Sequence, residues 1–164
     1  MTTAIKGNDT STFGGAITAN NVGAGNVLQV VSTTSSTNFT TTSQTLQDTG
    51  FSASITPSSS SSKILAIVNY NIYVAQNGQG APFVYCRGSL ARESTQLQEA
   101  RLAVNTGNTA LTDLGNHVTI VYLDSPATTS SITYKLFVSS LIYSFSTQFN
   151  WATPSTFTLM EIAG

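Results

Sequence analysis

The stretch KILAIVNYNIYVA at Lys63–Ala75 decides the fold. Its first half is apolar at every position from Ile64 to Val68, which is typical of a strand that is covered on both faces. Asn77 and Gly78 then begin a turn signal. The stretch therefore predicts a long, buried β-strand that ends in a turn.

Further strand patterns flank this stretch. They cover residues 27–31, one or two segments within 40–56, and residues 83–90, 96–104, 117–123, 131–145 and 157–163. Residues 96–104 also fit helical spacing, but a strand is favoured because the neighbouring segments are strands. The turn at residues 124–126 predicts that the strands before and after it pair with each other. About eight short strands with uneven loops predict an all-β, antiparallel jelly-roll sandwich.

The first 26 residues differ in composition from the rest. They are rich in Gly, Asn, Thr and Ala, and their few large apolar residues are Ile5, Phe13, Ile17 and Val22. Such a segment buries too little apolar surface to fold alone. We predict that residues 1–26 form an extended attachment arm or the end of a stem, and that residues 27–164 form the jelly-roll domain.

The composition excludes several classes of protein. Only 8% of residues are charged and the net charge is −1, whereas Thr and Ser together account for 48 of 164 residues. The six Lys and Arg residues are scattered, so they cannot form the cationic footprint of a nucleic-acid binder. No apolar run reaches the length of a membrane span, and the N-terminus carries no export signal pattern. A Ser/Thr-rich, charge-poor protein of this kind is expected to be a virion component made in the host cytoplasm, or a fragment of an exported adhesin.

Two predicted strands, at residues 63–68 and 131–145, have more apolar surface than one sheet face requires. In residues 131–145, one face carries Ile132, Tyr134, Leu136 and Val138, and the opposite face carries Phe137, Leu141, Tyr143 and Phe145. A sandwich has one dry face per sheet, so a second apolar face predicts a subunit interface. The alternative is that a loop within residues 38–50 covers it.

No residue pattern predicts catalysis, a cofactor or a metal centre. The chain has a single histidine, His117, and no Gly-x-Ser-x-Gly motif, so a Ser-His-Asp arrangement is not favoured. Glu93 and Glu99 lie near arginines, which predicts ion pairs. Glu161 lies on an apolar face and needs a partner, for which Arg101 or Lys135 is the expected residue. Cys86 alternates with apolar residues and is expected to be buried. A calcium ion held by loop oxygens at Asn105, Asn108, Asp113 and Asn116 stays an alternative.

Three segments together resemble the small jelly-roll domains of tailed-phage structural proteins, especially the tail fibres of marine and cyanobacterial phages. They are VLQVV at 27–31 and TPSSSSSKIL at 56–65, both within the matching stretch 27–74, and FTLMEIAG at 157–164. The resemblance covers most of the chain except roughly residues 78–116. The leading TTAIKGNDTSTFGGAITANNV resembles the stem sequence of such fibres. The resemblance implies a trimer, similar in shape to tumour necrosis factor-like heads, that is attached to a fibre or a capsid.

The resulting hypothesis is a non-enzymatic virion protein that acts as a homotrimeric, receptor-binding tail-fibre head. A capsid decoration protein or head fibre is the alternative, and a bacterial adhesin module is a further one. The expected partners are sister copies, a neighbouring baseplate, shaft or capsid protein, and a host surface glycan or protein. The candidate trimer-interface residues are Leu65, Ile67, Phe137, Leu141, Tyr143 and Phe145. The candidate receptor-contact residues are Phe149, Trp151, Asn77, Gln79, Asn105 and Asn108. For Phe149 and Trp151 the favoured alternative is that their rings lie in the core or in the trimer interface.

Overall fold

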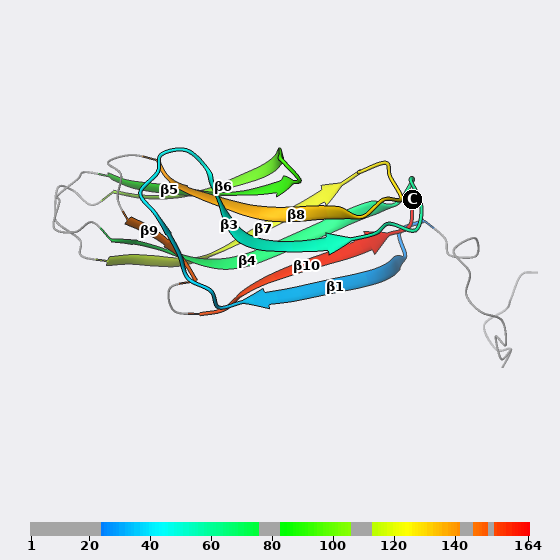
Figure 1. The fold of residues 1–164 in the computed structure, drawn as a ribbon, viewed down its shortest axis with the longest axis horizontal. Helices are drawn as coiled ribbons and strands as arrows, with labels where there is room; N and C mark the ends of the chain where they lie inside the picture. Colours follow the sequence, from blue (N-terminus) through cyan, green and yellow to red (C-terminus); the bar gives the residue numbers. More distant parts are fainter. Residues whose placement is uncertain (1–23, 76–82, 106–112, 142–145, 151–152) are drawn as a thin grey trace, which may run out of the picture.

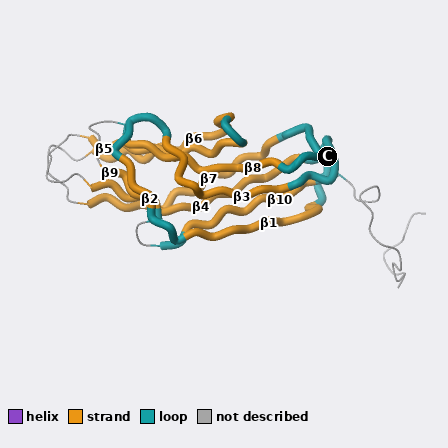
Figure 2. Tube along the Cα trace, viewed as in Figure 1, coloured by secondary structure: helices purple, strands orange, loops and turns teal. Residues whose placement is uncertain are grey.

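The computed structural model describes residues 24–75, 83–105, 113–141, 146–150 and 153–164, and these residues form two antiparallel sheets (Figures 1 and 2). Sheet A contains β1 (Val27–Ser35), β2 (Phe39–Thr41), β4 (Lys63–Ala75), β7 (Asp113–Asp124), β9 (Ser146–Phe149) and β10 (Ser155–Ile162). Sheet B contains β3 (Gln47–Ile55), β5 (Phe83–Arg92), β6 (Thr95–Asn105) and β8 (Ile132–Ser140). Nowhere in these residues is there a helix with the length and apolarity needed to cross a membrane.

The strand order is that of a jelly roll. β10 pairs with residues 63–69 of β4, and β9 pairs with residues 72–75 of the same strand. On their other sides, β10 pairs with β1 and β9 pairs with β2. Sheet A therefore has four positions, occupied by β1/β2, β10/β9, β4 and β7, and sheet B has the order β3-β8-β5-β6. Two four-position sheets in this order confirm the predicted jelly-roll sandwich. The segment at 96–104, which also fitted helical spacing, lies in strand β6.

The core lies between the two sheets and contains one side chain from every second position of each central strand. In β4 the inward side chains are Ile64, Ala66, Val68, Tyr70, Ile72 and Val74, all fully buried. Phe51 packs against both Phe149 and Phe157, with 5.6 Å between ring centroids in each pair. Cys86 is buried as expected, and burial raises the pKa of its thiol to about 12. The thiol is therefore held protonated and unreactive at neutral pH.

The predicted pairing of residues 117–123 with 131–145 is wrong. β7 pairs with β4 along its whole length, whereas β8 lies in the other sheet, between β3 and β5. The chain between them crosses from one sheet to the other, and Ala127 adopts a positive φ of 53° in that connection. A short connection can cross the sandwich as well as fold back on itself, so the turn signal alone did not specify the partner strand.

A buried carboxylate joins the two sheets near this crossing. Asp124 at the end of β7 accepts hydrogen bonds from Arg92 Nη1 and Tyr134 Oη of sheet B, each at 2.7 Å. The Ser125 amide is a third donor, at 2.9 Å. Tyr134 is fully buried, and burial together with this hydrogen bond raises the pKa of its hydroxyl far above the usual range.

We expect Tyr134→Phe to lower the free energy of unfolding by about 1–2 kcal/mol, because a buried carboxylate loses one of its donors. Chemical denaturation measures this change. The matched control is Tyr85→Phe at a half-buried position on sheet B. It is expected to change the free energy by less than about 0.5 kcal/mol, and equal losses in the two variants would contradict the role given to Asp124.

The two ends of the sandwich differ in what they carry. At one end the start of the domain lies against its last residues, since Gly25 N donates to Ala163 O and Ala163 N donates to Asn26 O, both at 2.8 Å (Figure 1). β4 ends and β5 begins at the opposite end, where β6 also ends and β7 begins. Any segment attached before Gly25 therefore leaves the domain at the end away from these strand junctions.

Candidate interaction surface

The outer face of sheet A carries aliphatic side chains in register across four strands. The register places Val30, Met160, Leu65 and Leu123 in one row. The next row of outward-facing positions holds Ser32, Thr158, Ile67 and Val121, so it is aliphatic only on β4 and β7. We call Val30, Leu65, Ile67, Val121, Leu123 and Met160 the outer aliphatic patch. These residues form a patch because side chains at alternate strand positions share a face, and directly opposed pairs lie within contact distance.

The patch is open to solvent in the single chain. Val30 and Val121 are each 55% exposed and Leu123 is 50% exposed, while Leu65, Ile67 and Met160 are half-buried. The row beyond it, toward the other end of the sheet, is polar and consists of Thr34, Thr156, Asn69 and Thr119. An apolar patch of several adjacent strands with a polar border is typical of an interaction surface.

Charged residues are distributed unequally between the two sheets. β1, β2 and β9 contain none, β10 contains only the buried Glu161, β4 contains only Lys63 at its first position, and β7 contains only Asp113 and the buried Asp124, at its two ends. Most charged side chains of the strands belong to sheet B: Asp48, Arg87, Arg92, Glu99, Arg101 and Lys135. The central part of the outer face of sheet A is therefore free of ionic groups that would have to be dehydrated on contact.

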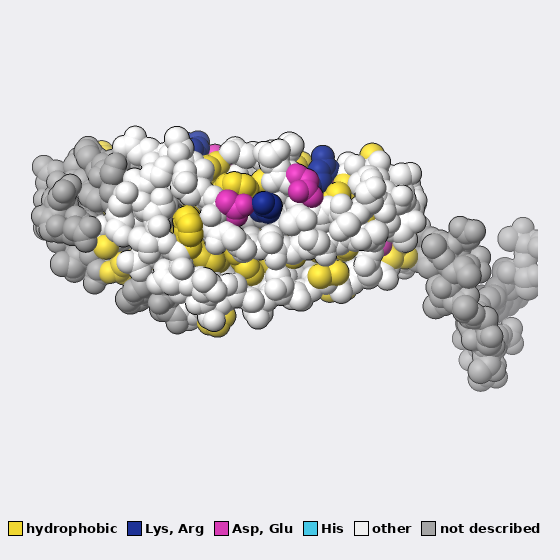
Figure 3. Space-filling view, viewed as in Figure 1, with side chains coloured by type: hydrophobic (Ala, Val, Ile, Leu, Met, Phe, Trp, Pro, Cys, Tyr) yellow, Lys and Arg dark blue, Asp and Glu magenta, His cyan; other side chains and the backbone are white. Residues whose placement is uncertain are grey.

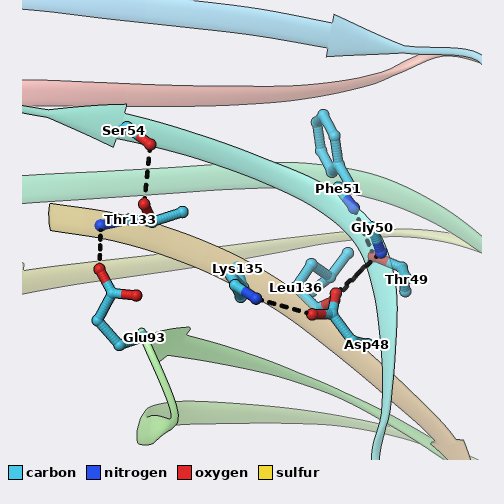
Figure 4. A network of polar contacts seen from close by, with 9 residues as sticks. All are labelled: Asp48, Thr49, Gly50, Phe51, Ser54, Glu93, Thr133, Lys135 and Leu136. Atoms are coloured by element: carbon cyan, nitrogen blue, oxygen red, sulfur yellow. Dashed lines mark hydrogen bonds and ion pairs between the residues drawn. The ribbon is translucent and has the colours of Figure 1, made fainter.

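Sheet B carries a polar network on its outer side. Lys135 Nζ lies 3.0 Å from Asp48 Oδ2, and Glu93 Oε1 accepts from the Thr133 amide at 2.7 Å (Figure 4). Ser54 and Thr133 exchange a hydroxyl hydrogen bond between β3 and β8. Figure 3 shows acidic and basic side chains next to each other on this part of the surface. This part of sheet B therefore presents charged and hydrogen-bonding groups, in contrast to the central outer face of sheet A.

The predicted trimer-interface residues do not share one face. Leu65 and Ile67 lie in the outer aliphatic patch, and their role in a trimer interface stays a prediction. Phe137 lies on β8 of sheet B, opposite Asp48 and Ser89, and the half-buried Leu141 follows β8. Tyr143 and Phe145 lie outside the described residues. The sequence pattern missed the patch residues of β1, β7 and β10, although their alternation was visible, because it did not specify which strands are neighbours.

The receptor-contact prediction for Phe149 is corrected by the structure. Its ring is 1% exposed and lies in the core beside Phe51 and Tyr70, so no surface is left for a ligand. Asn105 is the last residue of β6. Asn77, Gln79, Asn108 and Trp151 lie outside the described residues, as do the arm residues Ile5, Phe13, Ile17 and Val22. Their roles stay predictions, together with the arm boundary at residue 26.

Glu161 has different partners from those expected. Its side chain is fully buried, and its oxygens accept from Ser58 N, Ser58 Oγ and Gln29 Nε2 at 2.7, 2.7 and 2.6 Å. Arg101 instead pairs with Glu99, which also binds Arg87, and Lys135 pairs with Asp48. Burial acts to raise the pKa of Glu161, but these donated hydrogen bonds hold the pKa below its ordinary value of 4.5.

This carboxylate brings together the three segments that carried the family resemblance. Gln29 belongs to VLQVV, Ser58 to TPSSSSSKIL and Glu161 to LMEI. Gln29 Nε2 also donates to Thr56 O at 2.7 Å. The motifs therefore specify a structural contact at the end of the sandwich, and the resemblance is to a fold and not to a reactive site.

The remaining candidates for chemistry are dispersed. His117 is exposed on β7 in the register position opposite Asn71, and Asp124 is bound to Arg92 and Tyr134. Among the described residues, no group of three His, Cys, Asp or Glu side chains could hold a metal ion. Of the four residues named for the calcium alternative, Asn105 ends β6, Asp113 and Asn116 lie on β7, and Asn108 lies outside the described residues.

Comparison with known proteins identifies no family for this chain. No protein-family model matches the chain, and no curated protein matches it. Solved structures with a similar chain course include the infectious bursal disease virus Gx strain, with 17% identity over 83% of this chain and 37% of that chain and a TM-score of 0.33. The structure of T=1 particles derived from the same virus shows 18% identity over 83% of this chain and 36% of that chain, with a TM-score of 0.36. The chain thus spans little more than a third of those chains. Likenesses this weak carry no argument about function, and the assignment of the fold rests on the strand order described above.

Proposed function

We propose that this chain is a non-enzymatic virion structural protein, in which three copies associate through the outer face of sheet A to form a tail-fibre head that binds a host receptor. The observation that carries the proposal is the outer aliphatic patch. It spans four strands without an ionic group between them, and a second copy offers a surface of the same chemistry. Contact between two such surfaces removes apolar area from water and separates no charge from its hydration shell.

The arrangement of the two ends supports the orientation of this head. The chain before Gly25 leaves beside Ala163, so an arm at residues 1–26 would extend from the same end as the patch. Cyclic association would bring three arms together at that end, where they could bind a shaft, baseplate or capsid protein. The strand junctions at the opposite end would then face outward, and three copies of a weak receptor contact would act with avidity.

We expect the full chain to sediment as a trimer at micromolar concentration, and Val121→Glu to weaken association by about 100-fold or more, because it buries a carboxylate in an apolar contact. Val121 lies on the edge strand β7 and is exposed in the single chain, so the substitution is expected to leave folding intact. Sedimentation equilibrium measures the association constant.

The matched control adds the same charge to the other sheet. Ser52→Glu places a carboxylate at an exposed position of β3, opposite Lys135, and is expected to sediment as the wild type does. A monomeric wild type, or a Val121→Glu variant that associates as strongly as Ser52→Glu, would refute the interface on sheet A. If the chain associates only with a different virion protein, that protein and not a sister copy covers the outer aliphatic patch.

The position in the particle tests the function itself. A tail-fibre head is expected in few copies at the tail and should bind host cells, whereas a decoration protein would cover the capsid in many copies and need not bind cells. Labelling the chain in intact particles and counting copies by electron microscopy separates the two. Deleting residues 1–26 is expected to prevent incorporation in either case, because the proposed arm supplies the attachment.

A further inference from the structure

β1 (Val27–Ser35) has one strand neighbour and one open edge. Within the described residues it pairs with β10 alone, at one side of sheet A (Figure 1). An edge strand presents a row of backbone N–H and C=O groups that are not bonded to another strand. Such groups bind an added strand, so this edge is a site for an extended segment of chain.

The bonds at the end of β10 show which of its residues face β1. Ala163 follows β10, and both its N–H and its C=O are bonded to the chain before β1, through Asn26 O and Gly25 N at 2.8 Å. In an antiparallel ladder a residue directs both backbone groups to one side, and the next residue directs them to the other. Burial alternates without interruption along β10. Leu159 and Phe157, which have the same parity as Ala163, therefore face β1.

The same alternation identifies the free backbone groups of β1. The residues opposite Leu159 and Phe157 are Val31 and Thr33, and these two therefore bond to β10. The residues that alternate with them direct their N–H and C=O groups to the open edge; they are Val30, Ser32 and Thr34. Each of the three offers one donor and one acceptor to an added strand.

The other edges of the two sheets carry charged or ionisable side chains. β3 and β6, the edges of sheet B, contain Asp48 and the pair Glu99 and Arg101, and β7, the other edge of sheet A, contains His117. Side chains of this kind discourage the pairing of an edge with another chain. β1 has no charge, proline or glycine among its nine residues, and its pairing irregularity is confined to its first residues. An uncovered β1 would therefore promote association of chains edge to edge.

A segment of the arm with the pattern of a strand is joined to this edge. Residues 12–19, TFGGAITA, lie outside the described residues, but their sequence has no charge and places Phe13, Ile17 and Ala19 at positions of one parity. This spacing is typical of a strand with one apolar face. Residues 20–26 connect the segment to β1, and Gly25 adopts a positive φ of 87° in a turn directly before the strand. A turn at this point allows the chain to fold back along β1.

We infer that, in a chain that is not attached to a particle, residues 12–19 add an antiparallel strand to the open edge of β1 in the same chain. The short connection sets the antiparallel direction and holds the segment at high local concentration, which favours the chain's own arm over that of a second copy. The added strand bonds the free N–H and C=O groups of β1. In the register that matches the parities, Phe13 and Ile17 lie on the inner side of the sheet, as Val31 does.

The inference goes beyond the proposed function, because it concerns the protein before assembly. In the particle the arm binds a shaft, baseplate or capsid protein, so residues 12–19 would leave β1 when the chain is attached. Until then the added strand covers an edge that would otherwise pair with other chains. The arm thus has two successive partners, of which the first is its own domain.

Amide hydrogen exchange of the full chain, followed by NMR at two protein concentrations, tests this contact. We expect the amides of Val30, Ser32 and Thr34 to exchange at least about tenfold more slowly than unbonded strand amides, at both concentrations. The reference amides are those of Thr119 and Val121, which the same alternation, carried across β10 and β4, directs to the open edge of β7.

A charge in the segment should remove the protection. Ile17→Asp is expected to speed the exchange of the three β1 amides by about tenfold or more, because a carboxylate on the inner side of the added strand would lose its hydration. The matched control is Ile5→Asp, which adds the same charge to the arm outside residues 12–19 and should leave the exchange unchanged. Both positions precede the domain, so neither substitution alters its core.

Fast exchange of Val30, Ser32 and Thr34 in the wild type would overturn the inference, and so would protection that persists in Ile17→Asp. Protection that develops only at the higher concentration would overturn the assignment to the chain's own arm and identify a second copy as the occupant. Sedimentation of the same samples separates these results from the proposed assembly. A trimer with an unprotected β1 refutes the arm contact alone, whereas a monomer with a protected β1 supports the arm contact and refutes the interface on sheet A.

Discussion

Gly88→Ala is expected to lower the free energy of unfolding by about 3 kcal/mol, because the new methyl group would overlap the ring of Tyr70. A Cβ atom at position 88 would lie 2.6 Å from Tyr70 Cζ and in still closer contact with Tyr70 Oη. Gly88 lies on β5 of sheet B and Tyr70 on β4 of sheet A, and both are buried. The ring is 1% exposed, and a closely packed core opposes its movement, so the overlap is expected to push the two sheets apart locally.

Chemical denaturation of two further variants tests this explanation. Gly115→Ala is the matched control, because its Cβ would meet Tyr73 Cδ2 at an ordinary 3.6 Å; it is expected to change stability by less than about 0.5 kcal/mol. Gly88→Ala combined with Tyr70→Phe should lose less than the sum of the single changes, since the closest overlapping atom is removed. Additive losses would show that the tyrosine ring is not the cause.

The second large effect is expected at Glu161. Glu161→Gln should lower the free energy of unfolding at pH 7 by about 2–3 kcal/mol, because a buried carboxylate that accepts from Ser58 and Gln29 is replaced by an amide. The amide retains a single acceptor oxygen, and its NH₂ group faces a donor. Equilibrium unfolding in denaturant measures the loss, and Glu93→Gln, an exposed glutamate, is the comparison.

The loss of unfolding free energy caused by Glu161→Gln should become smaller as the pH falls. The pKa of Glu161 in the folded protein is below the ordinary value of 4.5, so on acidification the unfolded chain takes up the proton first. The stabilisation is therefore complete above about pH 4.5 and declines as the pH falls toward the lower, folded-state pKa. The stability curves of wild type and Glu161→Gln should converge in this acidic range, and a constant difference down to low pH would contradict the ionised state of Glu161.

Strand positions and fold class followed from the sequence because they depend on local patterns. Alternation in residues 83–90 identified β5 and the buried position of Cys86, and the apolar run from Ile64 to Val68 identified the central strand β4. Regularly spaced strands without a helix predicted a sandwich or barrel, and the uneven loops between them favoured a jelly roll. These features need only the period of the side chains along one segment.

Partners across the fold could not be predicted in the same way. β7 and β8 follow each other in the chain yet lie in different sheets, and Glu161 binds Ser58 and Gln29 instead of a basic residue. The pattern around Phe149 allowed either a receptor contact or burial, and the structure places its ring in the core beside Phe51 and Tyr70. In each case the decisive neighbour is distant in sequence, and no local pattern identifies it.

The sequence by itself determined that this protein is built of strands, carries few ionic groups and has more apolar strand surface than one sheet face needs. Only the tertiary structure decided that Val30, Met160, Leu65 and Leu123 form one row on sheet A, while most of the charged side chains of the strands belong to sheet B. The physical reason is that side-chain alternation is a property of each strand, whereas a surface arises from the order and register in which strands pair.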